Sequence, residues 1–275
     1  MKGMQEIRAA IEEARLRRGP GRGIIAALAG AGGKTTAMFA LARLYADEGL
    51  SVAVTTTTRI YDPRDEAGRS FDRVVIDPLL GQAQAAAPDL PAMAAMAGLR
   101  EAVAPRRGGI IVLAAGRDDR EGKLIGVDPS RCADLAGAFG LVLVEADGSR
   151  GLPVKAPASH EPVLPREADI VFGFIGLDSL GKPATATVVH RLDRFLSITG
   201  ATPGSPIAPE YLGRLAAHPE GLFKSAPAGA LRVAVLNKSD CTTDELAVRA
   251  ADAVEASGAD CAVILASLGP QSVPQ

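Results

Sequence analysis

A glycine-rich turn followed by a lysine and two threonines carries the clearest chemical signal in the sequence. Residues 24–36 read IIAALAGAGGKTT, an apolar run that leads into the turn. Glycines let the backbone curl so that successive N–H groups point at one anion, and a helix beginning after the turn adds a partial positive charge. In loops of this kind the lysine reaches the β- and γ-phosphates of a nucleotide, and the first hydroxyl ligates Mg²⁺. The predicted nucleotide-binding residues are therefore Gly30, Ala31, Gly32, Gly33, Lys34, Thr35 and Thr36.

The turn departs from the full phosphate-loop pattern at one position. The pattern G-x-x-x-x-G-K-[ST] requires glycine at position 28, where this chain has Leu28. The shorter pattern that is present, G-x-x-G-K-T-T over residues 30–36, resembles the loop of the Mur ligases. The alternative is a strand-to-helix turn whose lysine is merely solvated. A strand is expected before the turn and a helix over residues 37–47 after it, and this context favours a nucleotide site.

A second signal is a pair of acids that follows an apolar run. Residues 141–149 read LVLVEADGS, which predicts a buried strand with Glu145 and Asp147 near its carboxyl end. The two acids are two positions apart, so they share one face if the strand continues through them. In phosphate-loop enzymes such an acid holds Mg²⁺ or orients the attacking water. We predict Lys34, Glu145 and Asp147 as catalytic residues, and Thr35, Glu145 and Asp147 as the residues on the metal side.

The third signal concerns the base of the nucleotide. Residues 232–240 read RVAVLNKSD, a strand ending in N-K-x-D, which resembles the guanine-recognition motif of GTPases. A carboxylate can accept hydrogen bonds from the N1–H and amino groups of guanine, a pairing that adenine cannot offer. The stem of the lysine can pack along the base. We predict Asn237, Lys238 and Asp240 as base-binding residues and GTP as the nucleotide, with ATP as the alternative. The other interpretation is a polar turn that caps the helix expected over residues 243–255.

Four further polar residues are candidates for contact with a substrate or with phosphate. Thr57 belongs to a run of threonines that follows the strand expected over residues 51–54. Arg150, Lys155 and His160 lie in a proline-punctuated segment after the acids, which we expect to be a loop near the nucleotide. His160 has no partners at metal-ligand spacing, so the sequence indicates no metal site there.

Composition narrows the classes of function. Of 275 residues, 47% are hydrophobic and 23% are charged, values typical of a globular protein with a sizeable core. A net charge of −2 argues against general binding of nucleic acid or of an anionic membrane. We find no signal peptide and no apolar stretch long enough to span a bilayer. The three cysteines, Cys132, Cys241 and Cys261, lack CxxC spacing, so we expect buried thiols in a reducing cytoplasm.

The expected elements alternate between strands and helices along the chain. This alternation predicts one α/β domain with a P-loop NTPase-like three-layer fold, in which helices flank a mainly parallel sheet. The domain is expected over residues 22–275, after an N-terminal helix within residues 1–21, with an irregular excursion around residues 177–230 where prolines are frequent. The helix should cover residues 4–18, and the charge run 117–121 should be a solvated loop. Further expected strands are 73–76, 110–114, 169–176 and 261–265, and further helices 82–102, 130–139 and 190–199.

Several blocks of the sequence together resemble a known family. They are GAGGKTT, VTTTTRI, LVEADGSRGLPVKAPASHEPVLP, GLDSLGKP, VVHR and VLNKSD. This combination is similar to the selenium-dependent molybdenum hydroxylase accessory proteins known as YqeC, over nearly the whole chain from Ile24 onward. The resemblance implies an NTP-binding P-loop fold. It also implies a link to the maturation of a molybdenum hydroxylase, with that enzyme or its cofactor-maturation proteins as partners.

These observations favour one function and leave two alternatives. The favoured function is a cytoplasmic accessory protein that binds Mg²⁺ and GTP and hydrolyses GTP slowly, so that a loop relaxes when the γ-phosphate leaves. The first alternative is an ATP-dependent ligase or kinase acting on a small acidic substrate, suggested by the Mur-like loop and by residues 150–160. The second is a module that holds nucleotide without turnover.

Overall fold

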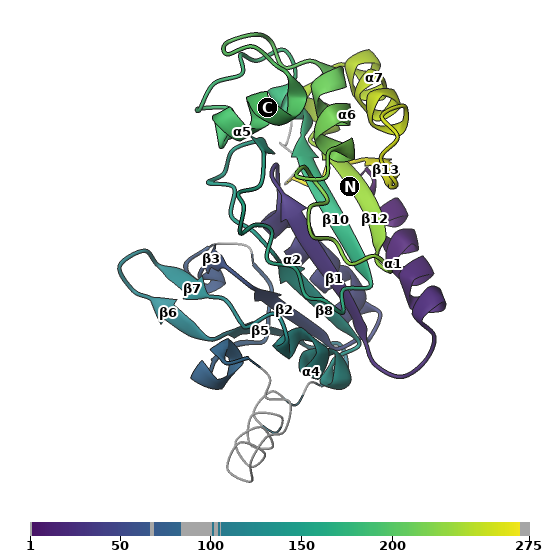
Figure 1. Ribbon diagram of the computed structural model, residues 1–275. Helices are drawn as coiled ribbons and strands as arrows, with labels where there is room; N and C mark the ends of the chain where they lie inside the picture. Colours follow the sequence, from purple (N-terminus) through teal and green to yellow (C-terminus); the bar gives the residue numbers. More distant parts are fainter. Residues whose placement is uncertain (1, 67–68, 84–100, 102–103, 105, 270–275) are drawn as a thin grey trace, which may run out of the picture.

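An eight-stranded sheet runs through the centre of the protein (Figure 1). The computed structural model describes residues 2–66, 69–83, 101, 104 and 106–269. All neighbouring strands of this sheet pair in parallel, in the order β13-β12-β10-β1-β8-β2-β5-β4. The strands are β1 (Ile24–Gly30), β2 (Val52–Thr56), β4 (Arg73–Ile76), β5 (Ile110–Ala114), β8 (Leu141–Glu145), β10 (Ile170–Gly176), β12 (Leu231–Asn237) and β13 (Ala262–Leu265).

Helices cover both faces of this sheet, which gives three layers (Figure 1). On one face, α1 (Met4–Arg18) and α2 (Lys34–Asp47) share a core with the central strands. On the other face, α4 (Arg131–Ala138) packs against β1 and β8, and α7 (Asp244–Glu255) packs against β12 and β13. Beside α7 lie α6 (Pro209–Ala217) and then α5 (Leu192–Thr199). The predicted α/β fold, with a mainly parallel sheet flanked by helices, is confirmed.

The sequence of β1 shows why helices are needed on both faces. Successive side chains of a strand point to opposite faces of the sheet. Ala26 and Leu28 join the core under α1 and α2, whereas Ile25 and Ala27 join the core under α4. Every residue of β1 is buried, as expected for a parallel strand that is covered on both sides.

The strand order places a crevice beside β1. From β1 the chain moves to β2 and on to the edge strand β4, returns to β8 directly beside β1, and then crosses to β10 on the other side. A reversal of this kind opens a crevice at the carboxyl ends of the strands, where open α/β sheets bind their ligands. The three motifs of the sequence lie at the carboxyl ends of β1, β8 and β12, on both sides of this reversal.

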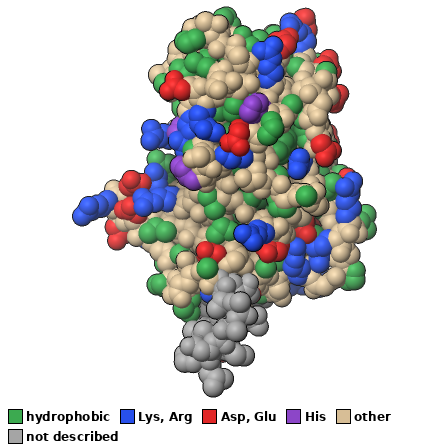
Figure 2. All heavy atoms as spheres, viewed as in Figure 1, with side chains coloured by type: hydrophobic (Ala, Val, Ile, Leu, Met, Phe, Trp, Pro, Cys, Tyr) green, Lys and Arg blue, Asp and Glu red, His purple; other side chains and the backbone are tan. Residues whose placement is uncertain are grey.

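A three-stranded antiparallel sheet projects to the left in Figure 1. It consists of β3 (Arg59–Tyr61), β7 (Lys123–Ile125) and β6 (Gly116–Asp118). The charge run over residues 117–121, which was expected to be a loop, therefore begins in β6 and continues into the turn before β7. Ion pairs between Arg117 and Asp65 and between Arg59 and Asp118 hold the projection together. Figure 2 accordingly shows basic and acidic side chains next to one another there.

The remaining elements are short. The strands β9 (Val154–Lys155) and β11 (Val189–His190) pair in parallel, although the segment that contains β9 was expected to be a loop. The excursion expected to be irregular contains the helices α5 and α6. Its prolines do not prevent α6, because Pro209 is the first residue of that helix, where no N–H donor is needed. Single 3₁₀ turns lie at Pro63–Asp65, Pro78–Gly81, Leu177–Ser179 and Ser239–Cys241.

Most other predicted elements are confirmed. The helix over residues 4–18 and the strands over residues 73–76 and 110–114 have the predicted bounds, and the others differ by up to three residues at their ends. The helix expected over residues 82–102 lies largely outside the described residues. Cys132 is buried as expected, but Cys241 is exposed and Cys261 is half-buried, so a set of three buried thiols was wrong. Within the described part of the chain, no helix has the length and apolar character needed to cross a membrane.

Candidate functional site

The predicted phosphate loop joins the carboxyl end of β1 to the first residue of α2. Gly30, Gly32 and Gly33 have φ values of 90°, 93° and 115°, which residues with a side chain rarely adopt. A Cβ at Gly32 would also collide with the backbone of Gly176 at the end of β10. Gly33 caps α2 without a side-chain hydrogen bond, which leaves the first turn of the helix without a capping side chain. The N–H groups of Gly30 and Ala31 are already used within the protein, because they donate to Asp147 Oδ2 and to the Phe174 carbonyl.

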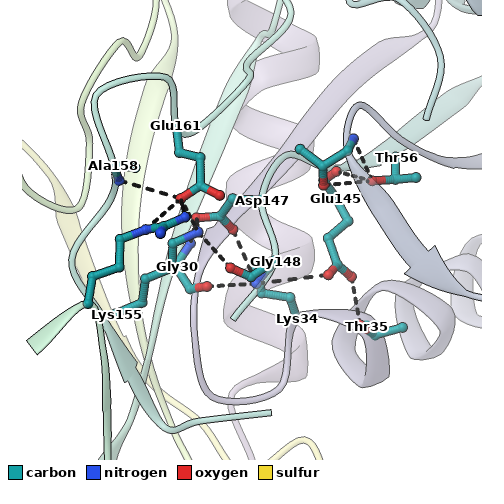
Figure 3. A network of polar contacts seen from close by, with 12 residues as sticks. Gly30, Lys34, Thr35, Thr56, Glu145, Asp147, Gly148, Lys155, Ala158 and Glu161 are labelled. Carbon is teal, nitrogen blue, oxygen red and sulfur yellow. Dashed lines mark hydrogen bonds and ion pairs between the residues drawn. The ribbon is translucent and has the colours of Figure 1, made fainter. Parts of the chain in front are cut away.

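Lys34 is buried between this loop and two carboxylates (Figure 3). Its Nζ donates to the Gly30 carbonyl at 2.6 Å and lies 3.2 Å from Oδ1 of Asp147 and 3.9 Å from Oε1 of Glu145. Burial opposes the charge of this lysine, but the two carboxylates outweigh burial and raise its pKa above the usual value. Lys34 is therefore a cation fixed beside the loop.

Asp147 is buried next to the loop and contacts its backbone. Its side chain is 2% exposed, its Oδ2 accepts the Gly30 N–H at 3.1 Å, and the same oxygen lies 2.9 Å from Nζ of Lys155. Asp147 does not line the cavity in which a ligand would sit. Its contacts therefore hold Lys34 and the glycine turn in place.

Glu145 has the opposite arrangement, because it lines the cavity and reaches the start of α2. Its Oε2 accepts a hydrogen bond of 2.6 Å from the Thr35 hydroxyl (Figure 3). Burial raises the pKa of Glu145 above its usual range, although Lys34 and Thr35 oppose this effect. The structure therefore separates the two acids predicted for the metal side, with Glu145 beside Thr35 and Asp147 beside Lys34.

The Thr35–Glu145 pair provides the kind of oxygen atoms that Mg²⁺ prefers. Mg²⁺ usually keeps several waters and takes only one or two protein ligands together with phosphate oxygens. No group of three or more His, Cys, Asp and Glu residues suited to a metal occurs in the part of the chain that the structure describes. A hydroxyl and a carboxylate that already lie 2.6 Å apart at the phosphate loop fit this sparse mode of binding.

A buried lysine links Asp147 to a second acid. Lys155 Nζ lies 2.9 Å from Asp147 and 2.8 Å from Oε2 of Glu161, and it donates to the Gly148 carbonyl at 2.6 Å. Arg191 pairs with the same Glu161 oxygen at 2.8 Å. Burial opposes ionisation of Glu161, but Lys155 and Arg191 lower its pKa to about 2, so it is a carboxylate at neutral pH. Lys155, predicted as a phosphate or substrate contact, lies instead inside a structural ion network.

A cavity of about 930 Å³ lies over these groups. Of the four residues predicted for substrate contact, only Arg150 lines it. Thr57 donates its hydroxyl to the Val163 carbonyl at 2.6 Å, and His160 is exposed outside the cavity. The lining residues are Gly32, Gly33, Lys34, Thr35, Thr36, Thr58, Arg59, Ile60, Tyr61, Glu66, Arg69, Lys123, Glu145, Gly148, Ser149, Arg150, Gly151, Leu152, Glu161 and Lys238.

The residues predicted to bind the base begin at the end of β12. Asn237 is buried, donates to the Gly32 carbonyl at 2.8 Å and accepts the Leu268 N–H at 3.0 Å, so it ties the glycine turn to the segment after β13. Lys238 lines the cavity and pairs with Asp178 at 2.9 Å. Asp240 is exposed and is not part of the cavity wall.

Sequence reasoning missed two parts of this site. Glu161 and Arg191 belong to the ion network, and the sequence signals for them were the HEP triplet and the VVHR block. Part of the cavity wall comes from the projecting sheet, through Arg59, Tyr61 and Lys123. Arg59 lies in the VTTTTRI block, but no motif marks Tyr61 or Lys123. This part of the wall forms only when β3 and β7 pair across more than sixty residues of chain.

Comparison with known proteins gives the family. The family model described as "YqeC protein" matches residues 26–193, which include the phosphate loop, both acids and the ion network. The protein "Uncharacterized protein YqeC" of Escherichia coli (strain K12) is 33% identical over 223 residues, covering 80% of this chain and 78% of that protein. No solved structure matches the chain. The chain therefore belongs to the YqeC protein family.

Proposed function

We propose that this protein binds Mg²⁺ and GTP and hydrolyses GTP slowly. The observation that carries the proposal is the grouping of Lys34, Thr35 and Glu145 at one cavity, where a glycine turn meets the first turn of α2. A cation, a hydroxyl and a carboxylate in this arrangement match the parts that bind a phosphate chain together with its metal. Lys34 and the backbone N–H groups of the turn would stabilise the phosphate charge.

Thr35 and Glu145 would hold the metal in this proposal. When bound, Mg²⁺ neutralises charge on the phosphate oxygens. Asp147 would act indirectly, through two contacts. Its ion pair with Lys34 keeps the lysine charged and in position, and its hydrogen bond from the Gly30 N–H fixes the glycine turn. The sequence predicted both acids as metal ligands, whereas this proposal assigns the metal to Glu145 and the positioning of Lys34 to Asp147.

The preference for guanine is supported by the contacts of the N-K-x-D segment. Asn237 connects the phosphate loop to the segment after β13, which supports a fixed distance between the N-K-x-D segment and the phosphates. Lys238 lines the cavity, so its stem can pack against a base whose phosphates lie on the loop. Asp240, two residues further on, is exposed and has its carboxylate available for hydrogen bonds from guanine.

The role in the maturation of a selenium-dependent molybdenum hydroxylase rests on the resemblance of the sequence blocks alone. In that role, loss of the γ-phosphate would relax the loop after β8. We expect the purified protein to release phosphate from GTP without any second small molecule. Measurement of inorganic phosphate over time, with and without Mg²⁺, tests this expectation. Release that requires an added acidic small molecule would contradict the switch.

That contrary result would favour a second function, an ATP-dependent ligase or kinase acting on a small acidic substrate. One observation supports it. The cavity extends from the phosphate loop to the projecting sheet, where Arg59, Tyr61 and Lys123 form its wall. A second substrate with an acidic group could lie against this wall, beyond the space that the phosphates need.

Glu145→Gln should weaken Mg²⁺-dependent hydrolysis while leaving Mg²⁺-free nucleotide binding unchanged. Glutamine keeps a carbonyl oxygen that can accept from Thr35, but it removes the negative charge that a divalent cation requires. We expect a loss of roughly tenfold or more in apparent Mg²⁺ affinity, from Mg²⁺ titrations of the hydrolysis rate. The control is Glu167→Gln, an exposed acid outside the cavity. Normal Mg²⁺ dependence in Glu145→Gln would make the acid structural.

A further inference from the structure

Arg150 differs from the other cations around the cavity because it has no partner among the described residues. It lines the cavity and is exposed, and it makes no hydrogen bond or ion pair with any residue that the structure describes. Lys34 and Lys238 line the same cavity but pair with Asp147 and Asp178. An unpaired guanidinium at a site built for phosphate is available to a ligand.

The backbone of Arg150 is also held in an unfavourable conformation. Arg150 and Gly151 have φ values of 55° and 73°, and the Leu152 N–H donates to the Ser149 carbonyl at 3.1 Å. Two central residues with positive φ are the pattern of a type I′ turn, in which asparagine and glycine are preferred. Arginine has no advantage at the first central position of such a turn, so its presence calls for a reason other than folding.

The turn is anchored on both sides by the ion network. Gly148, just before the turn, accepts a hydrogen bond of 2.6 Å from the buried Lys155, which also pairs with Asp147 and Glu161. Asp147 in turn lies 3.2 Å from Lys34 in the phosphate loop. The backbone just before Arg150 is therefore tied to Lys34 through a short chain of buried contacts.

We propose that Arg150 is a catalytic residue that contacts the γ-phosphate during hydrolysis. This inference rests on the proposed function and adds to it a residue that stabilises the transition state from within the same chain. The oxygen of water attacks the γ-phosphorus, and the bond from that phosphorus to the β–γ bridging oxygen breaks. GDP leaves with the electron pair, and the proton lost by water passes to solvent. The planar guanidinium can donate two hydrogen bonds to the phosphoryl oxygens as their charge develops.

The test replaces Arg150 by the residue that the turn itself prefers. Arg150→Asn keeps a side chain that tolerates positive φ, so the turn and the fold should be retained, while the guanidinium is lost. The matched control is Ser225→Asn, because Ser225 also has a positive φ of 60° but is exposed outside the cavity. Arg150→Lys tests whether charge without the planar fork is sufficient.

Two measurements decide the assignment: kcat and KM for Mg²⁺·GTP, and the affinities for a non-hydrolysable GTP analogue and for GDP with aluminium fluoride, which mimics the transferring phosphoryl group. We expect Arg150→Asn to lower kcat by roughly 10³-fold, as for arginines that act on this transition state. Its affinity for the aluminium fluoride complex should fall in parallel, while binding of the GTP analogue changes little. Arg150→Lys should recover only part of the loss.

Three results would overturn the assignment. Unchanged kcat and unchanged binding of the aluminium fluoride complex would place Arg150 away from the phosphate. An equal loss of affinity for the GTP analogue would make it a ground-state binding residue. A loss seen only as a raised KM for an added acidic small molecule would make it a substrate contact. Failure of the wild-type chain to bind GTP at all would overturn the proposed function first, which separates that outcome from these three.

Discussion

Lys34→Ala should reduce the binding of GTP and of ATP below detection while the chain remains folded. Lys34 is the only basic side chain within residues 30–36, and it lies on the cavity wall beside the glycine turn. Hydrogen bonds to charged groups contribute about 1.5–3 kcal/mol each, and 1.4 kcal/mol corresponds to a factor of ten. Loss of a lysine that contacts two phosphates should therefore weaken binding roughly 100-fold or more. Isothermal titration calorimetry with each nucleotide measures this loss.

The fold should survive because Asp147 keeps other partners. Without Lys34, its carboxylate still lies 2.9 Å from Lys155 and still accepts the Gly30 N–H. The loss of stability should therefore stay below the about 3–5 kcal/mol expected when a buried charge loses its sole partner. Circular dichroism and urea unfolding check this point, and Lys182→Ala, which removes an exposed lysine outside the cavity, serves as the control. Unchanged GTP and ATP affinity in folded Lys34→Ala would contradict the phosphate-loop assignment.

Asp240→Asn should exchange the base preference of the protein. Asp240 lies in a 3₁₀ turn after β12, and its exposed carboxylate is free to accept two hydrogen bonds from groups that adenine lacks. Asparagine would place a donor against the guanine N1–H and would lose hydrogen bonds to a charged group, which contribute about 1.5–3 kcal/mol each. GTP affinity should therefore fall roughly 10- to 100-fold.

The same variant should gain affinity for xanthosine triphosphate, because the 2-oxo group of that base can accept from the new amide. ATP affinity should barely change. The matched control is Asp244→Asn, which alters an exposed acid at the start of α7 that is not part of the N-K-x-D segment. Calorimetric titration of the wild type and both variants with GTP, xanthosine triphosphate and ATP measures the change in base preference. If Asp240→Asn shows no shift toward xanthosine triphosphate, the segment only leads into α7.

The central part of the site could be predicted from sequence because its geometry is local. The glycine turn between an apolar strand and a helix places Lys34 and Thr35 at adjacent positions, whatever the rest of the chain does. Placing Glu145 beside Thr35 required only that β8 pair with β1, because the carboxyl ends of parallel strands meet at one edge. The structure confirms the fold and brings these three residues to one cavity.

The roles of Asp147 and Lys155 could not be predicted in the same way. Spacing indicated that Asp147 would share a face with Glu145, but β8 ends at Glu145, so the strand geometry does not extend to Asp147. The sequence predicted Lys155 as a contact for phosphate or substrate, in a proline-punctuated loop near the nucleotide. Its burial depends on Glu161, on Arg191 and on pairing of β9 with β11, which lies over thirty residues later in the chain. Ion networks of this kind are set by tertiary contacts that no local pattern records.

Calorimetric titration of the wild-type protein with GTP, in the presence and absence of Mg²⁺, tests the central claim most directly. The arrangement of Lys34, Thr35 and Glu145 predicts one nucleotide site per chain and tighter binding with Mg²⁺ than without it. The N-K-x-D segment predicts that this site binds GTP more tightly than ATP. Binding of ATP in preference to GTP would contradict the assignment of the base. Absence of binding by either nucleotide to the folded chain would contradict the phosphate site itself.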